Sequence, residues 1–570
     1  MKLQFYQRKI FKKQTYLFLA FILNVFLRSF YPISLCADII PQERKIEWNP
    51  GIPDGIPERT IVFANVKLPP YNAVGDGLKD DTESIQTAIN DCPANQVVYL
   101  PKGTYKISDE LVIKKGIVIR GDGPNYTVVK NQSNSSCNII NIDGGYALSA
   151  IKVESGYQKG SKKISVANAS SLSVGDFIRI YQNNDSALVH ISGCSGTCSW
   201  CGDSGEHVMG QIVEIIEIKG NELTINRPLY FTFKQSLDPE IKKLNLLKNV
   251  GIEDLKLEEV DSRGNNIRMF YVAYCWVRNI ESAYPSGSHI RIYSSYRCEI
   301  RDSYFHHGHN YDGGGAYGVF LYNRCSDCLI ENNIFYVTRH AMIIESGGCG
   351  NVFGYNYSKD PQGSIGDQWL FSDMACHGAH PYMNLFEGNV AAHLSCDNIW
   401  GSSSHNTFFR NHIERKASPP DEPVVKYGLR AVEIMENNYY INIVGNVLGN
   451  EDCQTDNTYY ETPEPGWAET RSIWDLKRPA DGRGPRYSTD EKVETTLIRH
   501  GNYDFLTQSI QWDSNINDHN LPNSYYLISK PDFFDDDTPW PLIGPNQIHN
   551  KYMLPAVKRF FSPKNFRFSN

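Results

Sequence analysis

The chain has 570 residues, 21% of them charged, and a net charge of −8. This length is enough for two or more domains. The acidic balance excludes a protein that mainly binds nucleic acid, because such proteins present a basic face to the phosphates. It does not exclude other anionic ligands, since a few arginines can serve one groove.

Residues 1–36 have the features of a secretory signal peptide. Five basic residues lie within residues 1–13 and precede the apolar run TYLFLAFILNVFL, which is the usual order of the charged and hydrophobic regions. This run is too short to span a bilayer, and no later stretch reaches that length. Small residues at Ser34 and Cys36 place the cleavage site near Cys36. We therefore expect a secreted or periplasmic protein without a transmembrane segment.

Removal of residues 1–36 takes away six basic residues and no acidic one, so the net charge of the mature chain changes from −8 to −14. This strengthens the exclusion of nucleic acid as a partner. Thirteen of the fourteen cysteines remain, in a compartment where disulfides persist.

The next segment, residues 60–150, contains three structural phrases: YNAVGDGLKDDTESIQTAI, VVYLPKGTYKI and IRGDG. Together they resemble the opening of the pectate lyase superfamily of right-handed parallel β-helices, which some glucanases and phage tailspikes share. In that family the motif is structural: the aspartates and the threonine cap a helix, here beginning near Glu83, that seals the first rungs of the solenoid. The resemblance therefore implies a fold, and a carbohydrate ligand only by association.

Residues 152 to about 240 predict an inserted small β-domain, because residues 160–182 and 210–229 alternate apolar and polar positions and contain a Gly-Asn turn. Within it lie Cys194, Cys198, Cys201 and His207. This spacing suits a zinc site. In an exported protein it favours a disulfide with one spare thiol.

From residue 245 to 450 a short phrase returns, as in CEIRDSYF, CLIENNIF, NLFEGNVA and INIVGNVL. Aligned on Ile280, Ser303, Asn333, Asn356, Asn389, Asn411 and Asn446, the steps are 23, 30, 23, 33, 22 and 35 residues. A period of 22 to 23 residues with alternating β-branched and polar positions predicts a solenoid of strands. Successive turns would stack about 4.8 Å apart.

This register predicts two internal columns. Five asparagines, Asn333 to Asn446, would bond to their neighbours above and below. Cys275, Cys298 and Cys328 share a second column and are interpreted as small buried hydrophobic residues. The complete fold prediction is all-β: a right-handed parallel β-helix over residues 60–150 and 245–450, with the inserted β-domain and an irregular C-terminal cap over residues 451–570.

All three enlarged turns have their extra residues at one corner, between the second and the third strand. Polar and titratable residues gather there, and these are the predicted site. The predicted catalytic residues are His306, His340, Asp373 and His377. The predicted substrate-binding residues are His307, Asp312, Tyr317, Arg339, Trp369 and His380.

Two reactions suit such a corner. In β-elimination from a uronate polysaccharide, a neutral base removes the proton α to the carboxyl group, and Arg339 would neutralise that group. Hydrolysis needs two carboxyl groups about 5 to 9.5 Å apart, for which Asp312, Asp367 and Asp373 are the candidates. No cofactor is predicted. Ca²⁺ stays open as an alternative that no motif supports, because the calcium-binding aspartates of pectate lyases have no residue-by-residue counterpart in this sequence.

A third class of function remains open. A tailspike-like or adhesin-like β-helix would bind a glycan at the cell surface without cleaving it. Binding alone favours aromatic and neutral polar groups, whereas this corner is rich in groups that titrate near neutral pH. The prediction is therefore an exported carbohydrate-active protein with a polysaccharide as its substrate or ligand. The oligomeric state is left open.

Overall fold

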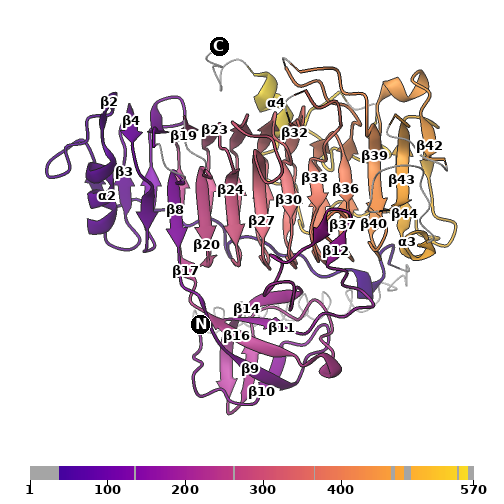
Figure 1. Ribbon diagram of the computed structural model, residues 1–570, viewed down its shortest axis with the longest axis horizontal. Coiled ribbons are helices and arrows are strands. Elements are labelled where there is room, and N and C mark those ends of the chain that lie inside the picture. Colours follow the sequence, from indigo (N-terminus) through magenta and orange to yellow (C-terminus); the bar gives the residue numbers. More distant parts are fainter. Residues whose placement is uncertain are drawn as a thin grey trace, which may run out of the picture.

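The protein is a parallel β-helix that carries a small β-barrel on one side (Figure 1). This computed structural model describes residues 38–133, 137–260, 264–364, 366–420, 422–463, 469–479, 490–548 and 551–562. The predicted fold class is confirmed. The predicted signal peptide lies outside the described residues. Within the described ranges, every helix is too short or too polar to cross a membrane.

Each turn of the β-helix contributes one strand to each of three parallel sheets, because short apolar stretches alternate with tight turns. Sheet A has the order β1 (Val62–Asn65), β3 (Val97–Tyr99), β6 (Val118–Arg120), β18 (Gly251–Glu253), β22 (Trp276–Arg278), β25 (Glu299–Arg301), β28 (Leu329–Glu331), β31 (Val352–Gly354), β34 (Leu385–Glu387), β37 (Thr407–Phe409), β40 (Asn442–Val444) and β44 (Ile498–His500).

Sheet B follows sheet A in every turn. Its order is β2 (Asp76–Asp80), β4 (Gly103–Ile107), β7 (Thr127–Asn131), β19 (Lys256–Glu259), β23 (Glu281–Ala283), β26 (Tyr304–His306), β29 (Ile334–Tyr336), β32 (Tyr357–Lys359), β35 (Val390–Ala391), β38 (His412–Ile413), β41 (Val447–Leu448) and β45 (Asn502–Asp504), with β46 (Ser509–Gln511) antiparallel at the end.

Sheet C completes the turn. Its order is β5 (Leu111–Ile113), β8 (Ile140–Asp143), β20 (Ile267–Phe270), β24 (Ser288–Tyr293), β27 (Tyr317–Tyr322), β30 (Met342–Ile344), β33 (Met374–Cys376), β36 (Leu394–Cys396), β39 (Arg430–Met435), β43 (Ser472–Arg478) and β42 (Tyr459–Glu461). The enlarged turns of the sequence all lie between a strand of sheet B and the next strand of sheet C, as predicted.

The predicted asparagine column is confirmed at the turn from sheet A to sheet B. Asn333 donates through Nδ2 to Oδ1 of Asn356 at 3.0 Å, and Asn356 donates in the same way to Asn389 at 3.0 Å. The column continues through Asn411 and Asn446 and ends at Asn502. Each amide also bonds to backbone groups of the neighbouring rung, so these buried polar groups are satisfied.

The interior of the solenoid is apolar and stacked rung on rung. Phe353, Phe386 and Phe408 stack at centroid distances of 4.7 and 4.8 Å, which is the spacing between adjacent strands. The predicted cysteine column is present, and Cys275, Cys298 and Cys328 are fully buried. Below Cys328 the same position passes to asparagine; Asn351 donates to Asn384, which donates to Asn406.

The insertion forms a closed six-stranded barrel, whose strands are β9 (Ala147–Ser155), β10 (Lys163–Val166), β11 (Phe177–Tyr181), β14 (Gly210–Lys219), β15 (Glu222–Ile225) and β16 (Glu240–Leu244). It does not interrupt the stacking of the β-helix, because β6 pairs directly with β18, β7 with β19 and β8 with β20. A hairpin of β12 (Ser192–Gly193) and β13 (Gly196–Thr197) leaves the barrel toward the β-helix. Figure 1 shows the barrel beside the solenoid.

At its N-terminal end the solenoid is closed by helix α2 (Thr82–Asp91), whose buried face is Ile85, Ala88 and Ile89. The predicted capping differs in detail. Asp81 stands at the N-cap but accepts from the backbone N–H groups of Val74 and Gly75, and it makes no side-chain cap bond to the helix. It therefore fixes the preceding turn.

The sheets continue past residue 450, where the sequence analysis ended the main β-helix. β43 completes the turn that begins with β40 and β41, and β44 and β45 add one more strand to sheets A and B, with Asn502 as the ladder residue. The remaining elements are η1 (Gln42–Arg44), η2 (Gln235–Leu237), β17 (Leu247–Lys248), β21 (Val272–Ala273), η3 (Glu451–Gln454), α3 (Glu491–Thr496) and α4 (Pro555–Phe561). The C-terminal segment packs on the outer faces of sheets A and B, which leaves sheet C uncovered there.

Candidate active site

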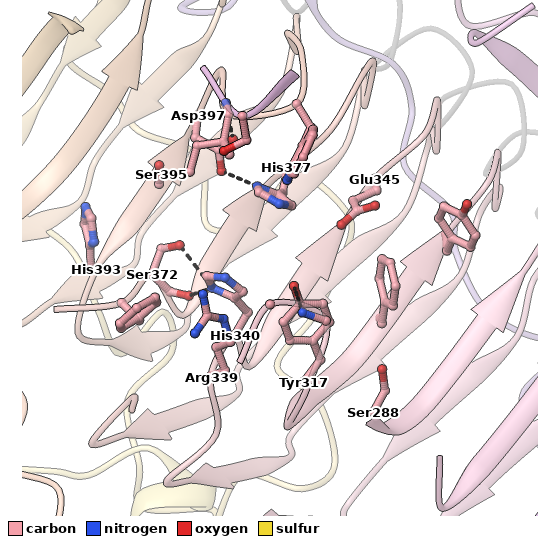
Figure 2. Close-up of a pocket in the computed structure, with 18 of the residues that line it drawn as sticks. Ser288, Tyr317, Arg339, His340, Glu345, Ser372, His377, His393, Ser395 and Asp397 are labelled. Atoms are coloured by element: carbon pink, nitrogen blue, oxygen red, sulfur yellow. Dashed lines mark hydrogen bonds and ion pairs between the residues drawn. The ribbon is translucent and has the colours of Figure 1, made fainter. Parts of the chain in front are cut away.

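A cavity of about 690 Å³ lies on the outer face of sheet C (Figure 2). One edge is formed by the enlarged turns that lead from sheet B to sheet C, including Gly313, Gly314 and Phe371. The opposite edge includes Ser195 and Trp200 from the inserted segment. The volume lies within the range of small-molecule and sugar sites in other proteins.

The floor of the cavity follows from the register of sheet C. One outward-facing residue per rung stands in the same column, and these are Arg291, Phe320, Ile343, Ala375, Ser395 and Glu433. Four of them, Arg291, Phe320, Ser395 and Glu433, line the cavity, whereas Ile343 and Ala375 are fully buried. Larger aromatic and charged residues stand at both ends of the column.

His340 lies two residues before β30, at the sheet B edge of the cavity. Its Nδ1 is 2.7 Å from the backbone carbonyl oxygen of Ser372. A carbonyl oxygen only accepts, so Nδ1 carries the proton and Nε2 carries the lone pair of the neutral ring. Burial, together with the charges of Arg339 and His377, holds the pKa of His340 well below its ordinary value. His340 is therefore neutral at pH 7.

His377 lies at the edge of sheet C opposite to His340, directly after β33. Its Nδ1 donates to Oδ2 of Asp397 on the next rung at 2.7 Å. Burial opposes the charged form, but the carboxylates of Asp397 and Glu345 outweigh it and raise the pKa of His377 to about 9. His377 is therefore an imidazolium at pH 7, with Nε2–H as its remaining donor.

The two imidazoles face each other in the cavity with opposite protonation states. Their ring centroids are 6.0 Å apart, and Figure 2 shows both side chains pointing into the same space. A pair of titratable groups whose environments push their pKa values apart is the usual arrangement of a catalytic base and acid.

Arg339 and Tyr317 complete this part of the cavity. Arg339 packs over the ring of Phe371 at 4.3 Å and donates to the backbone oxygen of Tyr311. No carboxylate lies within ion-pair distance of Arg339 among the described residues, so its charge is available to an anionic ligand. The ring of Tyr317 is 5.2 Å from that of His340, and burial raises the pKa of Tyr317 to about 12.

Five of the ten predicted site residues line this cavity: Tyr317, Arg339, His340, Trp369 and His377. The register argument that Tyr317 and His340 are vertical neighbours holds, because Val319 pairs with Met342 two residues later in each strand. Trp369 contributes at the rim, where the guanidinium groups of Arg430 and Arg478 pack on its ring.

The structure does not bring the other two predicted catalytic residues to the cavity. His306 belongs to β26 and lies on the outer face of sheet B, where it contacts Glu281 at 3.2 Å. The Asp373 carboxylate is buried below the turn, where it accepts from Ser358 Oγ and from the backbone N–H of Ala392. Burial raises the pKa of Asp373 to about 7. These contacts indicate a structural role.

Three predicted substrate-binding residues also lie outside the lining. His307 packs against Tyr284 and Tyr336 on the sheet B side. His380 is fully buried between the hydroxyl groups of Ser402 and Ser404. Asp312 is exposed and accepts from Ser364, which ties the loop that carries Gly313 to the next enlarged turn.

The position of His377 differs from the prediction in one respect. The sequence alignment placed it at the corner between sheets B and C, with His340, but it follows β33 and stands at the far edge of sheet C. The two side chains still meet, because β33 has only three residues and its outward residue is the small Ala375.

Several lining residues were missed by the sequence analysis, most notably Glu345. The register places Tyr322, Glu345, His377 and Asp397 at one position on four successive rungs. The signal was present in the sequence, since Glu345, His377 and Asp397 each directly follow the third strand of their turn. Among the described residues, no group of three or more His, Cys, Asp and Glu side chains is arranged to hold a metal ion.

Comparisons with known proteins agree with the fold. Residues 63–198 match the family model of rhamnogalacturonase A/epimerase, pectate lyase-like. The tailspike gp61 of Pseudomonas phage phi297 is 15% identical, with a TM-score of 0.51 over 78% of this chain and 75% of its own. The chain therefore has a parallel β-helix fold, and residues 63–198 are similar to the pectate lyase-like family.

Two further matches cover a short stretch of the chain or are looser. A stretch of 69 residues is 39% identical to mannuronan C5-epimerase AlgE1 of Azotobacter vinelandii, and it covers 10% of this chain and 5% of the epimerase. The Gp54 tailspike of Acinetobacter baumannii bacteriophage AP22, solved in complex with a capsular saccharide, is 13% identical with a TM-score of 0.49 over 76% of this chain and 69% of its own.

Proposed function

We propose that this protein is an exported enzyme that cleaves a uronate polysaccharide by β-elimination in the cavity on sheet C. The observation that carries the proposal is the pair His340 and His377, which lie 6.0 Å apart with opposite protonation states. An unpaired Arg339 stands beside His340. These are the base, the acid and the carboxylate-binding group that the reaction needs.

In the first step, Nε2 of His340 removes the proton from the carbon α to the uronate carboxylate. The electron pair of that C–H bond moves toward the carboxylate, which becomes an enolate with two negative oxygens. Arg339 holds this group and stabilises its charge. The bound carboxylate also raises the basicity of His340, because a nearby anion favours the imidazolium.

In the second step, the enolate expels the glycosidic oxygen from the β carbon, and a carbon–carbon double bond forms in the sugar ring. Nε2–H of His377 donates its proton to the leaving oxygen, so the released chain ends in a hydroxyl group. Asp397 keeps His377 charged before the transfer and orients it. One proton is taken and one is given, so the reaction is balanced without water.

Carbohydrate as the substrate class has independent support. The family model that matches residues 63–198 is named for a rhamnogalacturonase and an epimerase, and the curated relative with a 69-residue match is a mannuronan epimerase. The export of this chain is proposed from residues 1–36. The disulfide between Cys198 and Cys201 is typical of such a compartment.

Glycosidic hydrolysis is the second candidate, and the observation that favours it is the placement of two carboxyl groups around His377. Glu345 and Asp397 occupy the rungs on either side of it, so their backbones are separated by about 9.6 Å. Burial raises the pKa of Glu345, as required of a general acid. Inverting glycosidases hold their two carboxyl groups about 6.5 to 9.5 Å apart, which side chains that lean toward each other from these two rungs would meet.

The test is incubation of the purified mature chain with a panel of uronate and neutral polysaccharides, followed by absorbance at 235 nm and by a reducing-end assay. β-Elimination produces both signals, because the new double bond is conjugated with the carboxylate. Hydrolysis produces reducing ends alone. Binding without either signal contradicts both candidates and supports a glycan-binding surface protein.

A further inference from the structure

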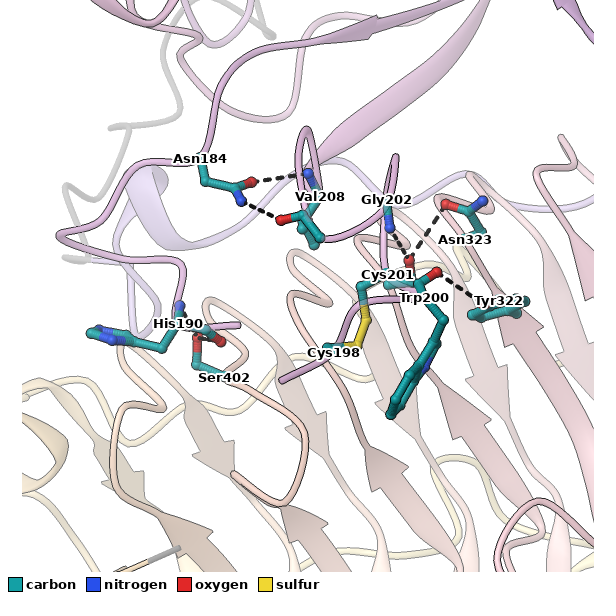
Figure 3. Close-up of a disulfide and its surroundings, with 12 residues drawn as sticks. Asn184, His190, Cys198, Trp200, Cys201, Gly202, Val208, Tyr322, Asn323 and Ser402 are labelled. Atoms are coloured by element: carbon teal, nitrogen blue, oxygen red, sulfur yellow. Dashed lines mark hydrogen bonds between the residues drawn. A yellow bond between two sulfur atoms is a disulfide. The ribbon is translucent and has the colours of Figure 1, made fainter. Parts of the chain in front are cut away.

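The cavity wall is built by two separate parts of the chain. Most of it belongs to the β-helix, but Trp200 enters from the segment that leaves the inserted barrel (Figure 3). The mechanism proposed above uses no residue of this segment. Its contacts with the β-helix are nevertheless extensive and specific.

Hydrogen bonds to the β-helix hold this segment at two places, near Cys194 and at Trp200. The N–H groups of Cys194 and Ser195 donate to the carbonyl oxygens of Asn398 and Ile399 at 3.2 and 3.0 Å. The Tyr322 hydroxyl donates to the carbonyl oxygen of Trp200 at 2.9 Å, and Figure 3 shows this bond beside the disulfide. The segment is therefore held in one position on the solenoid.

The disulfide between Cys198 and Cys201 brackets Trp200 and packs on the turn that carries His377. Gly378 directly follows His377, and a Cβ atom at Gly378 would lie 3.5 and 3.6 Å from the sulfur atoms of Cys198 and Cys201. The closed loop of four residues fixes where the indole of Trp200 can point.

Trp200 presents an aromatic face to the cavity. Its ring makes an edge contact with Trp400 at a centroid distance of 4.6 Å. Its exposed fraction is 39%, which is high for a tryptophan held by so many contacts. Indole faces bind the apolar C–H faces of sugar rings through buried area and weak C–H contacts.

We propose that Trp200 and Trp400 form a platform that binds one sugar ring of the polysaccharide at the His377 side of the cavity, and that the Cys198–Cys201 disulfide holds Trp200 in place. The inserted barrel thereby supplies part of the substrate site. This inference rests on the proposed function, because it takes the cavity to be the polysaccharide site.

The test separates binding from turnover. Wild-type protein is applied to a microarray of plant, algal and bacterial polysaccharides, and affinity for the strongest ligand is then measured by titration. We expect Trp200→Ala and Trp400→Ala each to weaken binding about tenfold. Trp200→Phe keeps an aromatic face and should recover most of it. Trp512→Ala is the matched control, because Trp512 stacks on His519 away from the cavity.

The Cys198→Ser/Cys201→Ser double variant tests the role of the disulfide, and melting curves identify any variant that does not fold. If the double variant is misfolded, folded wild-type protein treated briefly with dithiothreitol takes its place. In either experiment we expect weaker polysaccharide binding with an unchanged fold. Equal binding by wild type and Trp200→Ala contradicts the platform, as does a wild-type protein that binds no polysaccharide. Loss of binding in Trp200→Ala from a protein without turnover supports the platform and contradicts only the proposed reaction.

Discussion

The edge between sheets A and B and the outer face of sheet C are built by the same turns of chain, yet they differ in one respect. At the A–B edge, successive rungs repeat the same asparagine, and each amide satisfies its neighbour. On sheet C, successive rungs carry Arg291, Phe320, Ile343, Ala375, Ser395 and Glu433. The repeated asparagines therefore satisfy one another's hydrogen bonds at the A–B edge. The varied residues of sheet C instead leave charged side chains facing a cavity.

This comparison divides the polar residues of the protein into two kinds. Ladder residues have every hydrogen bond made within the protein, so their loss should affect stability. Cavity residues such as Arg339 and His377 keep a donor or a charge directed at the cavity, so their loss should affect function. Four predictions test this division, from the largest expected effect to the smallest.

The largest effect is expected on turnover. His340→Ala and His377→Ala should each lower kcat by about 10³-fold, because each removes a proton-transfer group, while the melting temperature stays within about 2 °C of wild type. The assay is the 235 nm rate at saturating substrate. His306→Ala is the control, because His306 lies on sheet B with Glu281; an equal loss in that variant would contradict the placement of the site.

The second effect is on stability. Asn389→Ala should lower the free energy of unfolding by about 3 kcal/mol, since it removes the buried acceptor of Asn356 Nδ2 and the buried donor to Asn411 Oδ1. Activity per folded molecule should not change. Denaturant unfolding measures the first quantity. Asn520→Ala, at an exposed position, should change stability by less than about 0.5 kcal/mol.

The third effect is on substrate affinity. Arg339→Gln should raise KM for a uronate polysaccharide by about 30-fold, equivalent to about 2 kcal/mol for the loss of a charge-assisted pair. Esterification of the uronate carboxyl groups should produce a similar increase with wild-type enzyme. An Arg339→Gln variant that retains its preference for free over esterified substrate shows that another group binds the carboxylate.

The smallest effect is a shift in the pH profile. In wild type, kcat/KM should fall as pH rises through about 9, because His377 then loses the proton that it must donate. Asp397→Asn removes the carboxylate that raises this pKa, so the alkaline limb should move to lower pH by more than one unit, or about 1.4 kcal/mol. An unchanged alkaline limb in Asp397→Asn means that another group controls it.

The features that could be predicted from the sequence are those that repeat. The positions of Asn333, Asn356 and Asn389 gave the period, the sheets and the ladder, because identical side chains at a fixed spacing can only stack. The same register placed Tyr317 beside His340. The resemblance of residues 71–89 to pectate lyases correctly indicated the fold, although Asp81 fixes a turn where a helix cap was expected.

The features that could not be predicted depend on strand length and on packing between segments that do not repeat. His377 was assigned to the wrong edge of sheet C, because the sequence does not show that β33 ends after three residues. Trp200 was not among the predicted site residues. Its place in the cavity depends on how the barrel segment docks on Asn398 and Ile399, and no periodic signal reports that contact.

The central claim is that a neutral His340 and a charged His377 share one cavity, and a histidine titration tests it without a known substrate. Protein labelled with carbon-13 at histidine Cε1 is followed by NMR from pH 5 to pH 10, with His340→Gln and His377→Gln used to assign the two signals. We predict that His377 titrates near pH 9 and that His340 stays neutral down to a pH below its ordinary value of 6.5. Two histidines that titrate together near pH 6.5 would contradict the account.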